Sequence, residues 1–224
     1  MSSLSSSSQI FANDDSGTGT VGGFFKYNGN DIYGITNNHV IANANNCHVG
    51  DPVFRYGDNE KIGTLHYWVT LNQNQVNYLD VALFKIDDEI EIEWLLPEGI
   101  DQPGDFDIAK NDENVYMMLQ DGSRKQGKVT LATINFNIPF VLCEKKFSFS
   151  DLIEIKSIEG TPFSVPGQSG SIIFNNANSI LGILLGTNST TTKSYAIPFI
   201  NRNRGIKQVF DLSLAFKRVV SDNP

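Results

Sequence analysis

The sequence predicts an all-β protein that ends in one α-helix. Short apolar runs recur along the chain, and Gly, Asn, Asp and Pro separate them, as in β-sandwiches and β-barrels. An Asn-Gly pair at 28–29 lies between two such runs and indicates a hairpin. Helical spacing occurs only in the tail, where Val209, Leu212, Phe216 and Val219 fall on one helical face.

The apolar runs give the expected strands in chain order. Residues with high strand propensity fill the runs, and turn residues such as those at 57–59 end them. In the first half of the chain the expected strands are 22–27, 31–36, 51–56, 61–70 and 81–86. In the second half they are 114–119, 124–134, 152–157, 171–174, 180–185 and 194–197.

Changes in composition divide the chain into segments. Residues 1–16 are rich in serine and are expected to form a loose polar arm. Residues 98–112 concentrate Pro, Gly and Asp, so we expect a linker there between two β-rich halves, 17–97 and 113–200. Residues 201–224 are expected to hold the C-terminal helix and a tail.

Charge and composition narrow the class of partner. The 224 residues include 17 Lys and Arg and 25 Asp and Glu, a net charge of −8. This charge weighs against a nucleic-acid partner, because phosphate binding needs a basic surface. No apolar stretch is long enough to span a membrane, so no membrane partner is expected. The chain lacks a basic and apolar leader and has 2 cysteines, which predicts a cytoplasmic protein with free thiols.

Three local motifs carry side chains of a catalytic type. A strand that ends in small polar residues delivers His39, and a lone Asp80 opens an apolar strand. A glycine-rich turn at 166–171 presents Ser169. A serine hydroxyl needs a base before it acts as a nucleophile. Histidine accepts and returns that proton near neutral pH, and a buried carboxylate fixes the histidine tautomer, so the motifs predict a triad.

The same turn supplies hydrogen-bond donors. The glycines around Ser169 let the backbone N–H groups of Gly167 and Ser169 point at one spot, where they can hold an oxyanion. Each motif alone also has a plain structural explanation: a strand-end histidine, a turn-capping aspartate and a serine in a tight hairpin. The three motifs in this order favour the catalytic interpretation. No His or Cys spacing typical of zinc is present, so no metal or cofactor is expected.

The order His39, Asp80, Ser169 resembles that of the chymotrypsin-like (trypsin-fold) serine peptidases. The chain is most similar to their compact bacterial trypsin-like peptidase domains, and residues 17–20, 180–186 and 194–198 also carry this resemblance. The resemblance implies two six-stranded antiparallel β-barrels, over 17–97 and 113–200, with the active site in the cleft between them. The C-terminal helix also fits that fold.

The resemblance also implies where the pocket for the P1 side chain lies. P1 is the substrate residue just before the cleaved bond. This pocket is expected to be lined by residues near the nucleophile and in two later strands: Phe163, Ser164, Leu185, Thr187 and Ser194. An acidic residue near the bottom of this pocket would select Arg or Lys at P1, and no acidic residue is present there. A small or apolar P1 residue is therefore the expectation, and an acidic P1 residue held by Lys193 stays open as the alternative.

The resemblance implies a serine endopeptidase that cleaves a specific protein or peptide partner through a covalent acyl-enzyme. Two alternatives remain open. The chain could be a latent or inactive module of this fold that acts as a protein-binding scaffold. It could also be a regulated protease that an activating partner protein switches on, because an unregulated cytoplasmic protease endangers its host.

Overall fold

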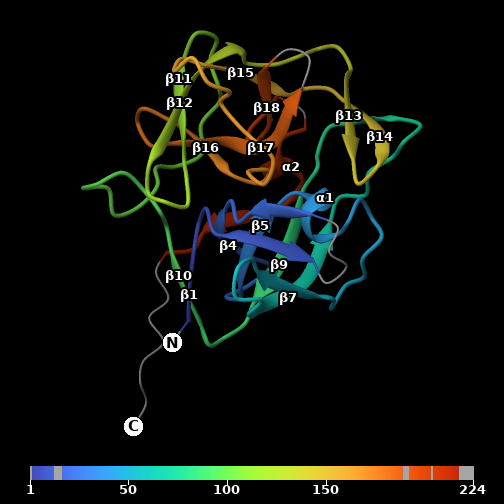
Figure 1. Ribbon diagram of the computed structural model, residues 1–224, viewed down its shortest axis with the longest axis vertical. Helices are drawn as coiled ribbons and strands as arrows, with labels where there is room; N and C mark the ends of the chain where they lie inside the picture. Colours follow the sequence, from blue (N-terminus) through green and yellow to red (C-terminus); the bar gives the residue numbers. More distant parts are fainter. Residues whose placement is uncertain (1, 13–16, 189–191, 203, 217–224) are drawn as a thin grey trace.

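The computed structural model describes residues 2–12, 17–188, 192–202 and 204–216, arranged as two β-rich lobes stacked one above the other (Figure 1). The described chain is mostly β, as the sequence predicts. In the described part of the chain, no helix is long and apolar enough to cross a membrane.

The first lobe is built on an eight-stranded sheet with the order β19-β4-β5-β9-β7-β6-β2-β3. Its strands are β2 (Gln9–Ala12), β3 (Thr18–Thr20), β4 (Gly23–Tyr27), β5 (Ile32–Thr36), β6 (Pro52–Arg55), β7 (Lys61–Trp68), β9 (Ala82–Ile86) and β19 (Leu212–Leu214). The central strands are buried and pack their apolar side chains into a cluster that includes Phe24, Leu65 and Phe84. The lobe is therefore a half-barrel sheet, where the resemblance implied a six-stranded barrel.

The second lobe is a closed six-stranded barrel with the order β11-β12-β15-β18-β17-β16. Its strands are β11 (Asn114–Met118), β12 (Arg124–Leu131), β15 (Ile153–Ser157), β16 (Ile172–Asn175), β17 (Ile180–Asn188) and β18 (Lys193–Pro198). Val129, Phe163 and Leu181 belong to its buried core. This barrel confirms the fold predicted for the second half.

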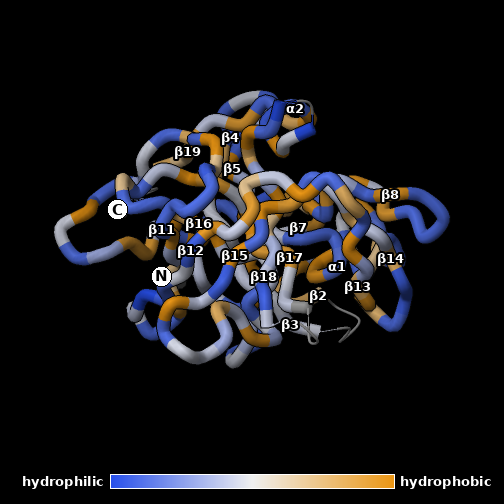
Figure 2. The backbone as a smooth tube through the Cα atoms, turned by 90° about the horizontal axis from the view of Figure 1, so that it is seen from above, coloured by the Kyte–Doolittle hydropathy of each residue, from blue (hydrophilic) through white to orange (hydrophobic). Residues whose placement is uncertain are grey.

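A small three-stranded sheet links the lobes at one end of the molecule (Figure 2). The hairpin of β13 (Ile138–Leu142) and β14 (Lys145–Phe149) belongs to the second half of the chain, and β8 (Val76–Asn77) belongs to the first. β14 pairs with β8 in parallel, with Ser148 opposite Val76. None of the strands expected from the sequence covers this hairpin.

Both termini differ from the expectations. The arm that we expected to be loose contains β1 (Ser2–Ser5), which pairs with β10 (Ile90–Glu93), and β2 of the first lobe. The expected C-terminal helix is reduced to one turn, α2 (Ile206–Val209), and Leu212 lies in β19, which pairs with β4. Pairing along the open edge of β4 outweighs the helical spacing, because tertiary contacts override local propensity. Val219, in the expected helix, lies outside the described residues.

The segment expected to be a linker joins β10 to β11 and packs against both lobes. Phe106 forms a bridge with Ile180 of the second lobe. Its ring stacks on Phe25 of the first lobe, with ring centroids 6.1 Å apart, and lies 5.0 Å from the ring of Phe199. These rings hold the two lobes together beside the linker.

Candidate active site

His39 lies on a single helical turn, α1 (Asn38–Ile41), which begins directly after β5. Buried asparagine side chains fix this turn. Asn37 donates a hydrogen bond of 2.7 Å to the carbonyl oxygen of Asp80, and Asn38 donates one of 2.7 Å to that of Val69. The His39 side chain is 14% exposed, so it reaches the surface from a fixed backbone.

Asp80 lies between β8 and β9, and its side chain is fully buried. Its Oδ1 accepts the backbone N–H of His39 at 3.1 Å, and its Oδ2 lies 2.5 Å from Nδ1 of the imidazole. An ionised carboxylate only accepts hydrogen bonds, so Nδ1 carries the proton. His39 Nε2 is then left as an acceptor, which a general base requires.

Ser169 lies in the turn that precedes β16, where three segments meet. Its carbonyl oxygen accepts the N–H of Thr20 at 2.7 Å, and the N–H of Gly170 bonds the carbonyl of Leu184 at 2.8 Å. Gly170 has φ +96°, and a Cβ atom there would lie 2.3 Å from the carbonyl oxygen of Thr20. Only glycine fits this position, so the turn places Ser169 against the first lobe.

The hydroxyl of Ser169 donates a hydrogen bond of 3.1 Å to the carbonyl oxygen of Leu185. Within the described residues, no hydrogen bond joins Ser169 to His39. Both side chains nevertheless line one cavity of about 300 Å³. The Ser169 hydroxyl must therefore leave the Leu185 carbonyl before it can bond a side chain across this cavity.

The turn before Ser169 is held open by hydrogen bonds of its own. The carbonyl oxygen of Gly167 accepts the Thr20 hydroxyl at 2.9 Å, and the Gln168 side chain accepts the N–H of Val165 at 2.8 Å. In the part of the chain that the structure describes, the N–H groups of Gly167 and Ser169 have no hydrogen-bond partner. These two donors are available to a ligand oxygen.

Of the residues expected to form the P1 pocket, some line the cavity and others are buried behind it. Leu185 and Thr187 line the cavity. Ser164 and Ser194 are buried behind Thr187, and the three hydroxyl groups hydrogen-bond to one another. Phe163 does not line the cavity: it belongs to the barrel core and packs over Gly127.

A further wall of the cavity was not expected from the sequence. Residues 140–143, at the end of β13, form this wall. Phe140 packs edge-on against Phe149 and Tyr195, with ring centroids 5.8 and 5.7 Å away. The apolar run at 138–142 is a weak signal for this strand, because its residues do not alternate in polarity and Pro139 interrupts it.

Lys193 forms an ion pair with the buried Glu154, with Nζ 2.7 Å from Oε1. Burial by itself raises the pKa of Glu154, but hydrogen bonds from Lys193 and from Thr130 outweigh it and leave this pKa below its usual range. The hydrogen bond to Glu154 raises the pKa of Lys193. Lys193 is thus engaged with Glu154 beside the pocket.

Glu154→Gln is expected to lower the free energy of unfolding at pH 7 by about 1–2 kcal/mol, because it removes the ion pair. The folded pKa of Glu154 is depressed, so the pair stabilises the fold above the unfolded pKa of about 4.3 and the effect is lost as pH falls through the folded value. Urea denaturation at pH 7 and pH 3 measures the difference. The exposed pair of Asp112 and Lys128 is the control, and Asp112→Asn should cost under about 0.5 kcal/mol. An equal deficit of the Glu154 variant at both pH values would contradict the assignment.

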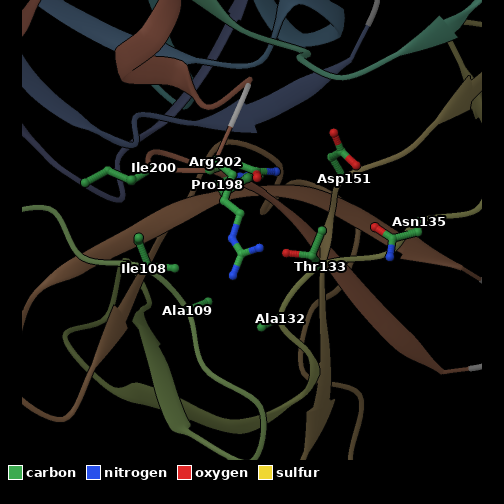
Figure 3. Close-up of a pocket in the computed structure, with 10 residues that line it drawn as sticks. Ile108, Ala109, Ala132, Thr133, Asn135, Asp151, Pro198, Ile200 and Arg202 are labelled. Carbon is green, nitrogen blue, oxygen red and sulfur yellow. The ribbon is translucent and has the colours of Figure 1, made fainter.

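A second cavity, of about 460 Å³, is lined by the inter-lobe segment, the second lobe and the chain after β18, and it shares no lining residue with the first cavity. Figure 3 shows that Arg202 extends into it, between Ala109 and Thr133. None of the expected site residues lines it. Over the described ranges, no group of three His, Cys, Asp or Glu side chains could hold a metal ion, and neither cysteine forms a disulfide.

The barrel, the half-barrel and the cleft-side His39–Asp80 pair define the class as a chymotrypsin-like fold. The chain matches the trypsin-like peptidase domain family over residues 17–183, more than half its length, and so belongs to that family. No curated protein matches it.

Solved structures of bacterial proteases share this fold with the chain. Nocardiopsis protease superposes with a TM-score of 0.65 at 13% identity, covering 97% of this chain and 100% of that one. Thermobifida fusca protease A superposes with a TM-score of 0.63 at 13% identity, covering 96% of this chain and 100% of that one. The chymotrypsin of Cellulomonas bogoriensis superposes with a TM-score of 0.62 at 15% identity, covering 95% of this chain and 98% of that one. At these identities the likeness shows the fold alone.

Proposed function

We propose that the protein is a serine endopeptidase with Ser169 as nucleophile, His39 as general base and acid, and Asp80 as the group that orients His39. One observation carries the proposal: the buried Asp80 carboxylate holds His39 Nδ1 at 2.5 Å, in the cavity that also contains Ser169. This arrangement leaves Nε2 facing the substrate side as a base.

The reaction follows from these positions. Ser169 Oγ gives its proton to His39 Nε2 and attacks the carbonyl carbon of the peptide bond. The resulting oxyanion accepts hydrogen bonds from the N–H groups of Gly167 and Ser169. His39 then protonates the departing amine, and water, activated in the same way, hydrolyses the acyl-enzyme.

The pocket supports a substrate with a small or apolar P1 residue. Thr187 lines the cavity, with the Ser164 and Ser194 hydroxyl groups bonded behind it, and no acidic residue lies among the lining residues. Lys193 is bound to Glu154, which weakens the alternative of an acidic P1 residue. Cleavage of a peptide mixture mainly after Arg, Lys, Asp or Glu would contradict this preference.

Labelling with a fluorophosphonate probe tests the proposed function, because the probe reacts with an activated serine and requires no knowledge of the substrate. We expect labelling of the native chain and its loss, by about 10⁵-fold or more in rate, in Ser169→Ala and in His39→Ala. Ser171→Ala, two residues after the nucleophile and outside the proposed triad, is the matched control and should still be labelled. Labelling that survives in Ser169→Ala would refute the assignment of the nucleophile.

A latent state is the second candidate, and a specific observation favours it. The Ser169 hydroxyl bonds the Leu185 carbonyl and not His39. Under this hypothesis a partner protein turns the hydroxyl toward His39. A folded native chain without labelling, which becomes labelled when a partner is added, would support latency over constitutive activity.

A further inference from the structure

Strand β13 has an edge that no other described strand covers. The small sheet has the order β13-β14-β8, so β14 pairs on both sides and β13 pairs on one side only. An uncovered edge presents backbone N–H and C=O groups that can pair with another extended chain.

The register shows which groups point outward from this edge. Cys143 and Glu144, with φ of 48° and 63°, form the two-residue turn, and Leu142 lies opposite Lys145. The pair that closes such a turn is hydrogen-bonded, and the pairs alternate along the hairpin. Val141, opposite Lys146, is therefore a non-hydrogen-bonded pair, and its N–H and C=O point away from β14.

Pro139 agrees with this assignment. It lies opposite Ser148, two residues from Val141, so it also belongs to a non-hydrogen-bonded pair. A proline has no N–H group and is tolerated where that group would face outward. Its position limits the edge to one complete donor–acceptor residue, Val141, plus one carbonyl.

The edge faces the proposed active site. Val141 is 67% exposed, and residues 140–143 line the cavity with His39, Ser169 and the segment Leu185–Thr187 of β17. A Cβ atom on Gly186 would lie 3.7 Å from the ring of Phe140, so β17 and β13 approach each other across that ring.

The hairpin is held in place before any substrate arrives. The Cys143 thiol bonds the carbonyl oxygen of His39 at 3.3 Å, and Lys145 bonds Asn46 at 3.0 Å. At its other end, Asn77 of β8 donates to the carbonyl oxygen of Ser148 at 3.1 Å. Because these contacts anchor the hairpin at both ends to the first half of the chain, its edge loses little conformational entropy when it binds a peptide.

We propose that β13 is a second docking strand for the substrate, which binds as an extended peptide between β13 and β17. The peptide accepts the N–H of Val141 and donates to its C=O along one edge, and its other edge faces Leu185–Thr187. This inference rests on the proposed function, since the occupant is the chain that Ser169 cleaves. The edge shares its cavity with the nucleophile, and Pro139 leaves it too short to favour pairing with a second copy of the protein.

Val141→Pro tests the proposal, because it removes the outward N–H and keeps the hairpin pairing. Lys146→Pro is the matched control: it lies directly opposite, and its N–H points away from the cavity. The probe is a library of peptides from denatured proteins, with cleavage followed by mass spectrometry. Each rate is divided by the fluorophosphonate labelling rate of the same variant, so that changes in the reactivity of Ser169 cancel.

We expect the normalised cleavage rate to fall about tenfold in Val141→Pro and to stay near the native value in Lys146→Pro. Equal rates in the two variants would overturn the docking strand and leave the proposed function standing. A labelled native chain that cleaves no peptide would also overturn it. Loss of labelling in the native chain would remove the proposed function, and this inference with it. Concentration-dependent dimerisation that Val141→Pro abolishes would show instead that the edge binds a second copy.

A second measurement uses the native chain and does not depend on the folding of a variant. The most rapidly cleaved peptide is resynthesised with single amide N–H groups replaced by ester oxygens, at bonds other than the cleaved one. Successive residues of a strand direct their N–H groups to opposite sides. A peptide between two strands should therefore lose several-fold in rate at consecutive positions. Sensitivity at alternate positions only would mean that one edge binds and would overturn the proposal.

Discussion

Asp80→Asn is expected to lower kcat about 10⁴-fold without unfolding the protein. The Asp80 carboxylate accepts hydrogen bonds from the backbone N–H and from Nδ1 of His39. An asparagine offers one acceptor and one donor in place of two acceptors, so its amide N–H group meets Nδ1 and favours the wrong tautomer. Nε2 then carries the proton and cannot accept the one from Ser169. Peptide cleavage and fluorophosphonate labelling measure the loss.

The chain contains a second His–Asp pair that serves as the control. His48 and Asp51 lie on the surface, with Nδ1 and Oδ2 3.8 Å apart and the histidine side chain 87% exposed. Asp51→Asn removes a carboxylate from a histidine that touches no proposed substrate group, so cleavage should remain within about twofold of the native rate. A similar loss in both variants would show that the effect is not specific to Asp80.

Phe25→Ala is expected to lower the free energy of unfolding by about 3–5 kcal/mol. Phe25 is fully buried and contacts the rings of Trp94, Phe106 and Phe199, at centroid distances of 5.9, 6.1 and 5.6 Å. Trp94 directly follows β10, Phe106 lies in the inter-lobe segment, and Phe199 directly follows β18. The substitution leaves a cavity where the lobes join, and the surrounding strands cannot collapse to fill it. Urea denaturation, followed by tryptophan fluorescence and by circular dichroism, gives the change.

Phe136→Ala is the matched control, because Phe136 is 56% exposed and should cost under about 0.5 kcal/mol. A loss below about 1 kcal/mol for Phe25→Ala would mean that the aromatic contacts do not stabilise the junction. Separate transitions of the two lobes in Phe25→Ala alone would support their coupling through these rings.

The chemistry could be predicted from short local segments. His39, Asp80 and Ser169 each follow or open a strand or occupy a glycine-rich turn, and such positions are recognisable without knowledge of the partner strands. The structure brings His39 and Asp80 into contact and places Ser169 in the same cavity. Their catalytic roles and the cytoplasmic location remain predictions.

The hairpin of β13 and β14 could not be found in the same way. Its turn consists of Cys143 and Glu144, which take positive φ angles usually adopted by Gly or Asn, and Pro139 interrupts its first strand. Pairing with β8 compensates for these weak local preferences. The wall that this hairpin gives to the cavity was missed for this reason.

The sequence by itself determined the all-β class and the order of the three reactive side chains, since both depend on local periodicity and turn chemistry. The closed second barrel was an expectation from the resemblance to the peptidase family. Only the tertiary structure decided which strand edges are covered. In the folded chain, part of the serine-rich arm pairs with β6, and Leu212 lies in β19, which pairs with β4. The Ser169 hydroxyl bonds the carbonyl of Leu185. Strand pairing joins residues far apart in the chain, so its free energy depends on partners that no local pattern specifies.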